Sequence, residues 1–146
     1  MLIISVAFYF WCVCFLCRHM FFCLPCVPLS LQMSSGHYIG FTDGSFCSTQ
    51  NLSSIAWVLY DTNGKLINLQ GISLGWKNNN IVEYSAIIGL LSKAVSLGIR
   101  YLVVKLDSQL VVLQLNNHYS VRNPQILRMY LRVWLLERCI RKLCSW

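Results

Sequence analysis

The chain has 146 residues, enough for one domain with a buried core, and its 12 Lys and Arg against 5 Asp and Glu give a formal net charge of +7. This balance suits an anionic partner, either a nucleic acid or an acidic membrane surface. Any site built from carboxylates must therefore use some of only five acidic residues: Asp43, Asp61, Glu83, Asp107 and Glu137.

Residues 1–32 differ in composition from the rest of the chain. They contain a single charged residue, Arg18, and five of the eight cysteines. Residues 2–17 are apolar except for Ser5, a run that is short for a membrane-spanning helix and lacks the preceding basic residues of a signal peptide. We therefore predict a folded domain over residues 33–146, preceded by an apolar, Cys-rich segment that is either membrane- or signal-like or an unfolded extension.

The location of the protein is suggested by its remaining cysteines. Cys47, Cys139 and Cys144 show no disulfide pattern, which fits a reducing compartment. The sequence thus favours the nucleus or the cytoplasm, with membrane contact expected only through residues 2–17.

Three apolar runs at the start of the domain predict an antiparallel meander. Strands are expected over residues 38–43, 55–61 and 65–75, and "TNGK" between the last two is a turn signal. The pair Asp43-Gly44 follows alternating apolar residues, which is a common hairpin signal. On local sequence alone, Asp43 is therefore interpreted as a turn residue.

The second half of the domain predicts helices around one buried strand. Asn78, Asn79 and Asn80 offer an N-cap, and Gly98 stands where a helix C-cap glycine belongs. The expected elements are a helix over 81–97, a strand over 101–106, a helix beginning after Asp107 and a helix over 125–143. The predicted fold is an α/β domain of order β-β-β-α-β-α-α.

Glu83 lies on the apolar stripe of the first predicted helix, in line with Ile87, Leu90, Ala94 and Leu97. A carboxylate on a stripe that faces the sheet is costly unless it is paired or binds a metal ion. The alternative is that Glu83 only favours the positive end of the helix dipole, which it could do equally well from the solvent side.

Asp107 ends the predicted central strand, where ligands of open α/β sheets gather, although it could instead be the N-cap of the next helix. If the first and fourth strands are neighbours, Asp43 and Asp107 lie side by side and the first helix delivers Glu83 to them. Carboxylates crowded in this way repel one another unless a cation joins them. An all-oxygen set of this kind suits Mg²⁺ or Mn²⁺.

The ordered motifs "FTDGS", "NNNIVEYSAIIGLLSKAVSLGI" and "VVKLDSQLVVLQLNN" resemble the type 1 ribonuclease H domain, in particular its plant and retroelement-associated "reverse transcriptase-like" branch. The resemblance runs from residue 38 to 117 and extends less fully to 132. It implies a mixed five-stranded sheet of order 3-2-1-4-5 and a monomeric domain. It also implies cleavage of the RNA strand of an RNA–DNA hybrid with two divalent ions.

The same resemblance assigns roles to residues. Asp43, Glu83 and Asp107 would be catalytic metal ligands, with Asp43 bridging two ions that activate the attacking water and stabilise the leaving 3′ oxygen. Contacts with the 2′-hydroxyls in the minor groove would select the RNA strand. The implied substrate-binding residues are Gly44, Ser45, Asn79, Asn80 and Gln109, and the implied phosphate contacts are Arg128 and Arg132.

The chain departs from the family near its C-terminus. The family carries a fourth carboxylate in an N-x-x-A-D-type segment after a fifth strand, whereas no Asp or Glu follows Glu137 here. From the sequence we expect the fifth strand and the last helix to be missing, which would leave an exposed sheet edge and a marginally stable domain. The alternative function is therefore a catalytically impaired, nucleic-acid-binding remnant of a retroelement ribonuclease H domain.

Overall fold

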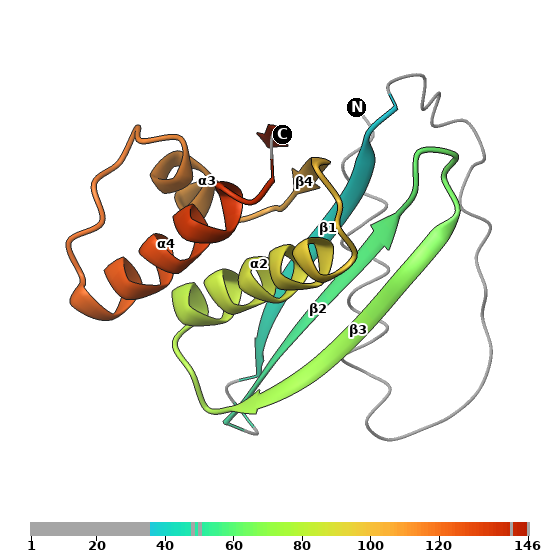
Figure 1. Ribbon diagram of the computed structural model, residues 1–146. Coiled ribbons are helices and arrows are strands. Elements are labelled where there is room, and N and C mark those ends of the chain that lie inside the picture. Colours follow the sequence, from blue (N-terminus) through green and yellow to red (C-terminus); the bar gives the residue numbers. More distant parts are fainter. Residues whose placement is uncertain (1–35, 48, 50, 141, 146) are drawn as a thin grey trace.

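The computed structural model of the protein describes residues 36–47, 49, 51–140 and 142–145, the last four through their backbone alone (Figure 1). Within these residues, none of the helices has both the length and the apolar character needed to cross a bilayer. The predictions made for residues 1–32, including membrane contact through residues 2–17, lie outside the described residues.

One mixed sheet of five strands, in the order β3-β2-β1-β4-β5, forms the centre of the fold (Figure 1). The strands β1, β2 and β3 pair antiparallel, β4 pairs parallel with β1, and β5 pairs parallel with β4. This order is the one that the family resemblance implies, and the β1–β4 pairing meets the condition on which Asp43 and Asp107 were expected to lie side by side. The bounds are β1 Tyr38–Cys47, β2 Leu52–Tyr60, β3 Leu66–Gly75, β4 Tyr101–Lys105 and β5 Lys142–Ser145.

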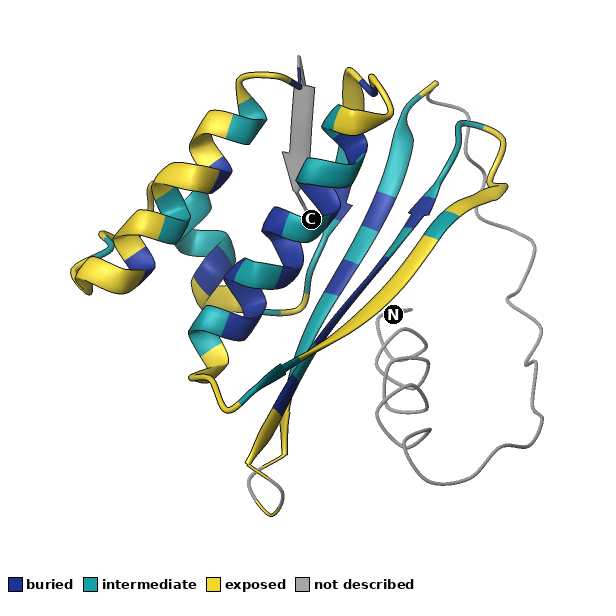
Figure 2. Ribbon diagram, turned by 60° about the horizontal axis from the view of Figure 1, so that its bottom comes forward, coloured by how far each residue is buried: buried dark blue, intermediate teal, exposed yellow. Residues whose placement is uncertain are grey.

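Three helices lie on one face of the sheet: α2 Asn79–Ser96, α3 Gln109–Leu115 and α4 Pro124–Glu137. Helix α2 crosses β1 and β2, and α4 packs against α2. Figure 2 shows that buried residues concentrate where α2 meets the sheet, whereas β3 and the outer side of α4 are exposed. The core therefore lies between α2 and the first two strands.

Helix α2, Asn79–Ser96, begins two residues before and ends one residue before the bounds that the sequence predicts. The Asn78 side chain accepts a hydrogen bond from the backbone N–H of Asn80 at 3.0 Å, and Gly98 follows the helix with φ +70°. The predicted stripe is buried from Glu83 to Ala94. Leu97 is an exception, because it is the C-cap residue and is 48% exposed.

Two predictions about the strands are wrong. Strand β1 does not turn at Asp43-Gly44 but continues to Cys47, with Asp43 opposite Ala56 and Gly44 opposite Ile55 in β2. The Asp-Gly pair can remain extended there because pairing along the whole of β2 outweighs a local turn preference.

The expectation of a missing fifth strand is also wrong. The last helix ends at Glu137 rather than near residue 143, and residues 142–145 pair with β4 as β5. Because β5 pairs with β4, the edge of β4 is not open and gives no reason to expect a marginally stable domain. Within the described residues no helix follows β5.

Candidate active site

Three acids from three separate elements meet at one point. Asp43 lies within β1, Glu83 lies in the second turn of α2, and Asp107 follows the end of β4. One carboxylate oxygen from each residue lies within 4.8 Å of the other two. The structure therefore brings together the three acids that the sequence singles out.

The acids meet where β1 and β4 part. Pairing between these strands covers residues 38–41 of β1, and β4 ends at Lys105. Phe41 pairs with Lys105, so Asp43 and Asp107 each lie two residues beyond the last paired position and come level with one another. The site thus lies at the carboxyl end of a parallel strand, where open α/β sheets collect ligands.

Gly44 sets the position of Glu83. A Cβ atom at residue 44 would lie 2.8 Å from Cγ1 of Val82 and 3.0 Å from the backbone nitrogen of Glu83. The absence of a side chain therefore allows the first turns of α2 to touch β1 and to place Glu83 beside Asp43. This packing function differs from the bend that the Asp-Gly sequence predicts.

The two alternative interpretations of the acids are not supported by the structure. The N-cap of α3 is Ser108, not Asp107. Glu83 is the fifth residue of α2, and the first turn of that helix contains no acid. Neither residue is explained by helix capping or by the helix dipole.

Burial and mutual repulsion raise the pKa of two of these carboxyl groups, those of Glu83 and Asp43. Burial, followed by the charges of Asp107 and Asp43, raises the pKa of Glu83 from 4.5 to about 8. Burial and the charge of Asp107 raise the pKa of Asp43 from 3.8 to about 6, although a hydrogen bond from the Gly44 backbone N–H opposes the rise. A divalent cation would relieve this repulsion, and three carboxylates form the hard oxygen donor set that such a cation prefers.

The predicted substrate-binding residues flank the acids. Asn79 and Asn80 open α2, one turn before Glu83, and Gln109 is the exposed first residue of α3, two residues after Asp107. Ser45 lies next to Gly44 in β1, and its hydroxyl is 2.9 Å from that of Ser54 in β2.

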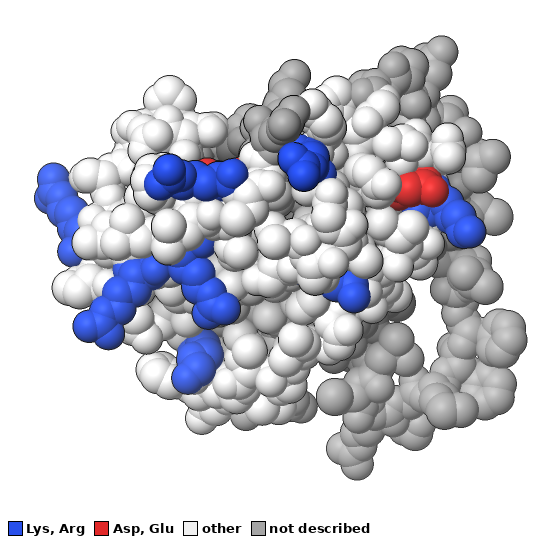
Figure 3. All heavy atoms as spheres, viewed as in Figure 1, with Lys and Arg blue, Asp and Glu red and all other residues white. Residues whose placement is uncertain are grey.

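The predicted phosphate contacts lie on a different element from all three acids. Arg128 and Arg132 are on the exposed side of α4. Figure 3 shows Lys and Arg side chains gathered on this part of the surface, whereas few Asp or Glu side chains are visible on the same face. These two arginines belong to a basic surface rather than to the acidic cluster itself.

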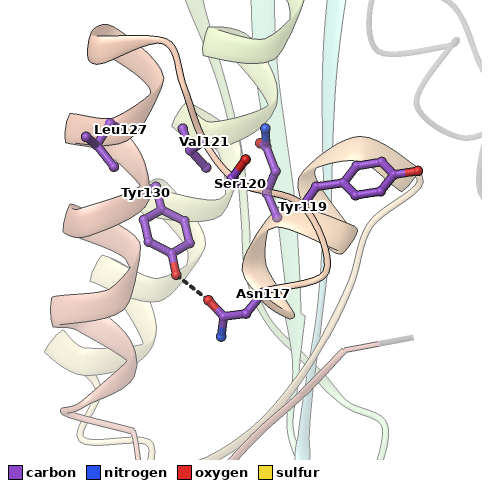
Figure 4. Close-up of a pocket in the computed structure, with 7 residues that line it drawn as sticks. Asn117, Tyr119, Ser120, Val121, Leu127 and Tyr130 are labelled. Carbon is purple, nitrogen blue, oxygen red and sulfur yellow. Dashed lines mark hydrogen bonds between the residues drawn. The ribbon is translucent and has the colours of Figure 1, made fainter.

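A pocket of about 280 Å³ opens between α3 and α4 (Figure 4). Within it the Tyr130 hydroxyl donates to Oδ1 of Asn117 at 2.8 Å, and none of the three acids lines it. Gln114, at its edge, accepts a 2.9 Å hydrogen bond from the hydroxyl of Tyr84, the residue after Glu83. Sequence reasoning missed this link between α2 and α3, since nothing local signals a pair 30 residues apart.

The family model described as "Reverse transcriptase-like" matches residues 41–143, which is most of the chain and includes all three acids. The chain belongs to the reverse transcriptase-like family. The match ends at residue 143, so it reaches the first two residues of β5, the strand that the sequence alone predicted to be missing.

Curated relatives of this reverse transcriptase-like domain include ribonucleases. Ribonuclease HI of Halobacterium salinarum is 29% identical over 97 residues, which are 66% of this chain and 49% of that protein. A protein of Mycobacterium tuberculosis that is named bifunctional is 34% identical over 71 residues, 49% of this chain and 20% of that protein. The chain thus spans about half or less of these relatives.

Solved structures show that the reverse transcriptase-like domain has the ribonuclease H fold. The crystal structure of RNase H1 from Halobacterium salinarum superposes with a TM-score of 0.71 at 26% identity, covering 76% of this chain and 84% of that one. LC11-RNase H1, solved in complex with an RNA/DNA hybrid, superposes with a TM-score of 0.68 at 23% identity, covering 75% and 83%.

Proposed function

We propose that this domain is an endonuclease that hydrolyses the RNA strand of an RNA–DNA hybrid, with Asp43, Glu83 and Asp107 as the ligands of two divalent ions, Mg²⁺ or Mn²⁺. The observation that carries the proposal is the convergence of these three carboxylates within 4.8 Å. The family match and the similarity to ribonuclease HI support it.

The roles of Asp43 and Glu83 follow from their positions. Asp43 lies in the stretch of β1, Ile39 to Cys47, that is paired with β2, so its backbone is fixed relative to the sheet. Glu83 is 6% exposed and retains a proton at neutral pH, since its pKa is about 8, until a cation takes the place of that proton. When bound, divalent cations lower the pKa of the attacking water and stabilise charge on the leaving oxygen.

Selection of RNA is assigned to the amide side chains beside the acids. Asn79, Asn80 and Gln109 carry groups that both donate and accept hydrogen bonds, as a 2′-hydroxyl does. A wide, shallow minor groove displays the 2′-hydroxyls of an RNA strand to such side chains. Their placement next to Glu83 and Asp107 supports a contact with the strand that is cut.

The test uses the full chain and an RNA–DNA hybrid labelled on the RNA strand. We expect cleavage of the RNA strand in Mg²⁺ or Mn²⁺, no cleavage in EDTA, and no cleavage of duplex DNA. Asp43→Asn should lower the rate by about 100-fold or more, because the carboxylate shared by the site is lost. Asp61→Asn is the matched control, since Asp61 lies in the β2–β3 turn, where its Oδ1 accepts two backbone hydrogen bonds.

A second candidate function, hybrid binding without efficient cleavage, is favoured by one observation. The cluster in the described residues contains three carboxylates, whereas the family pattern has four. Tight hybrid binding with no metal-dependent cleavage in either Mg²⁺ or Mn²⁺ would support this alternative. Cleavage that Asp43→Asn leaves unchanged would contradict the proposed site.

A further inference from the structure

The loop between β3 and α2 presents an exposed tryptophan on a fixed backbone. Trp76 is 66% exposed, more than any other large apolar side chain in the described part of the chain. The next residue, Lys77, is held on both sides of its backbone by the fully buried Ser53. Its N–H donates to Ser53 Oγ at 3.0 Å, and Ser53 Oγ donates to its carbonyl at 3.1 Å.

Residues on both sides of Trp76 are restrained as well. Gly75 ends β3 with φ +65°, and Asn78 caps α2 through its side chain. A side chain anchored in this way loses little backbone entropy when a partner covers it. The loop therefore holds an indole ring out toward solvent instead of allowing it to fold back onto the core.

Sheet geometry places Trp76 relative to the acids. Phe46, Ser53 and Gly75 lie in one row across β1, β2 and β3, and Phe46 is three residues after Asp43. With about 3.4 Å per residue along a strand and about 4.8 Å between strands, the Cα atoms of Asp43 and Gly75 are about 14 Å apart.

The first turn of α2 connects the loop after Gly75 with the acidic cluster at Asp43. It leads from the loop, through Asn79 and Asn80, to Glu83 beside Asp43. Trp76, the two asparagines and the acidic cluster thus follow one another along the N-terminal end of α2. A nucleic acid held at the acids would extend over this stretch of surface.

We infer that Trp76 packs against a sugar of the DNA strand, across the minor groove from the RNA strand held at the acids. This inference rests on the proposed function. The bases of a duplex are stacked on one another, so an aromatic ring in the minor groove meets the sugars instead. A deoxyribose offers an apolar face, whereas a ribose at the same place would bring a 2′-hydroxyl against the ring without a partner.

Two further features favour a nucleic-acid strand as the partner that covers the Trp76 side chain. The second backbone of an A-like duplex lies across a wide, shallow minor groove from the first, so its contacts must lie at a distance from the acids, as the loop after Gly75 does. Lys77, adjacent and exposed, brings a positive charge that suits the phosphates of the same strand. Trp76 therefore contributes to recognition of DNA as the partner of the RNA strand.

Binding can be measured without turnover by placing each variant in the Asp43→Asn background with Mg²⁺, using fluorescence anisotropy of a labelled hybrid. Trp76→Ala should weaken hybrid binding by about 5- to 10-fold, and Trp76→Phe should weaken it by less than about 3-fold. Binding of double-stranded RNA of the same sequence should change by less than about 2-fold in Trp76→Ala. Leu69→Ala, which truncates another exposed apolar side chain of the same sheet, should leave hybrid affinity unchanged.

The outcomes separate this inference from the proposed function. Hybrid affinity that stays within 2-fold of the parent in Trp76→Ala overturns the inference alone, as does an equal loss for hybrid and double-stranded RNA. A chain with Asp43 intact that leaves the RNA strand of the hybrid uncut in Mg²⁺ and in Mn²⁺ overturns the proposed function, whatever the Trp76 variants do. Thermal melting of each variant checks that the fold is kept, which we expect because the Trp76 side chain is exposed.

Discussion

Two buried hydroxyls near the site differ in whether they have a partner. Thr42 is 4% exposed, and within the described part of the chain its Oγ1 has no hydrogen-bond partner. Ser53 is equally buried but makes two hydrogen bonds to the Lys77 backbone. Because an unpaired buried hydroxyl costs free energy and a paired one does not, the two residues should respond in opposite ways to removal of the hydroxyl.

We predict that Thr42→Val raises the free energy of unfolding by about 1 kcal/mol, since a methyl group of the same shape replaces an unpaired hydroxyl. Ser53→Ala should lower the same quantity by about 1–2 kcal/mol, because it leaves the Lys77 backbone groups without their partner. Urea denaturation of both variants measures the difference. A stabilising Ser53→Ala or a destabilising Thr42→Val would contradict this account.

At the level of single residues, the sequence predicted the acids better than their surroundings. Glu83 and Asp107 were predicted from helical periodicity and from a strand end, and both lie in the cluster. Asp43 was locally a turn residue, and only its combination with the other two acids indicated a site. Trp76 carried no signal, because the hydrogen bonds that hold its loop join Ser53 and Lys77, which are 24 residues apart.

At the level of elements, the close approach of α2 to β1 determines the geometry of the site. Gly40 and Gly44 both face α2, where a Cβ would meet Leu90 and Val82 respectively. The strand and the helix therefore pack more closely than side chains would permit, and Glu83 comes within reach of Asp43.

We predict that Gly44→Ala lowers the free energy of unfolding by about 1–3 kcal/mol, because the added methyl group overpacks the contact with Val82. It should also reduce hybrid cleavage by about 10-fold or more, since α2 must shift and carry Glu83 away from Asp43. Denaturation and cleavage assays on the same preparation measure both effects. Wild-type cleavage in a stable Gly44→Ala variant would show that the close approach is not needed.

The elements that the sequence predicted well are those with strong local signals. Helix α2 has an asparagine cap and a closing glycine, and β4 is a compact β-branched run, so both are found near their predicted bounds. Strand β5 and the second half of β1 were missed for a common reason. Both are defined by pairing with a distant strand, and tertiary pairing can override local propensity.

At the level of the whole molecule, the acidic cluster links stability to pH. In the unfolded chain, Glu83 and Asp43 ionise near their ordinary pKa values of 4.5 and 3.8. In the folded protein, they retain their protons up to about pH 8 and about pH 6 respectively. The folded state therefore binds more protons than the unfolded state between these limits, and stability must fall as pH rises through them.

We predict that, in EDTA, the free energy of unfolding falls by about 2–4 kcal/mol between pH 4 and pH 8, and that Mg²⁺ or Mn²⁺ restores part of it at the upper end. Cation affinity should rise over the same range, with protons released on binding. Thermal melting with and without cation measures the first effect, and calorimetry in two buffers measures the second. Glu83→Gln serves as the control and should flatten the pH dependence; a profile identical to that of the wild type would contradict the assignment.

The contact between Gly44 and Val82 predicts how substitutions at residue 44 compare with substitutions at the three acids. Residue 44 offers no functional group, yet nearly every substitution there would disturb the spacing of the acids. A mutational scan would consequently rank this position beside the three carboxylates in intolerance. The cause would be steric, so the loss at residue 44 should grow with the size of the replacement and not depend on its polarity, whereas each acid should discriminate between its amide and its homologous acid.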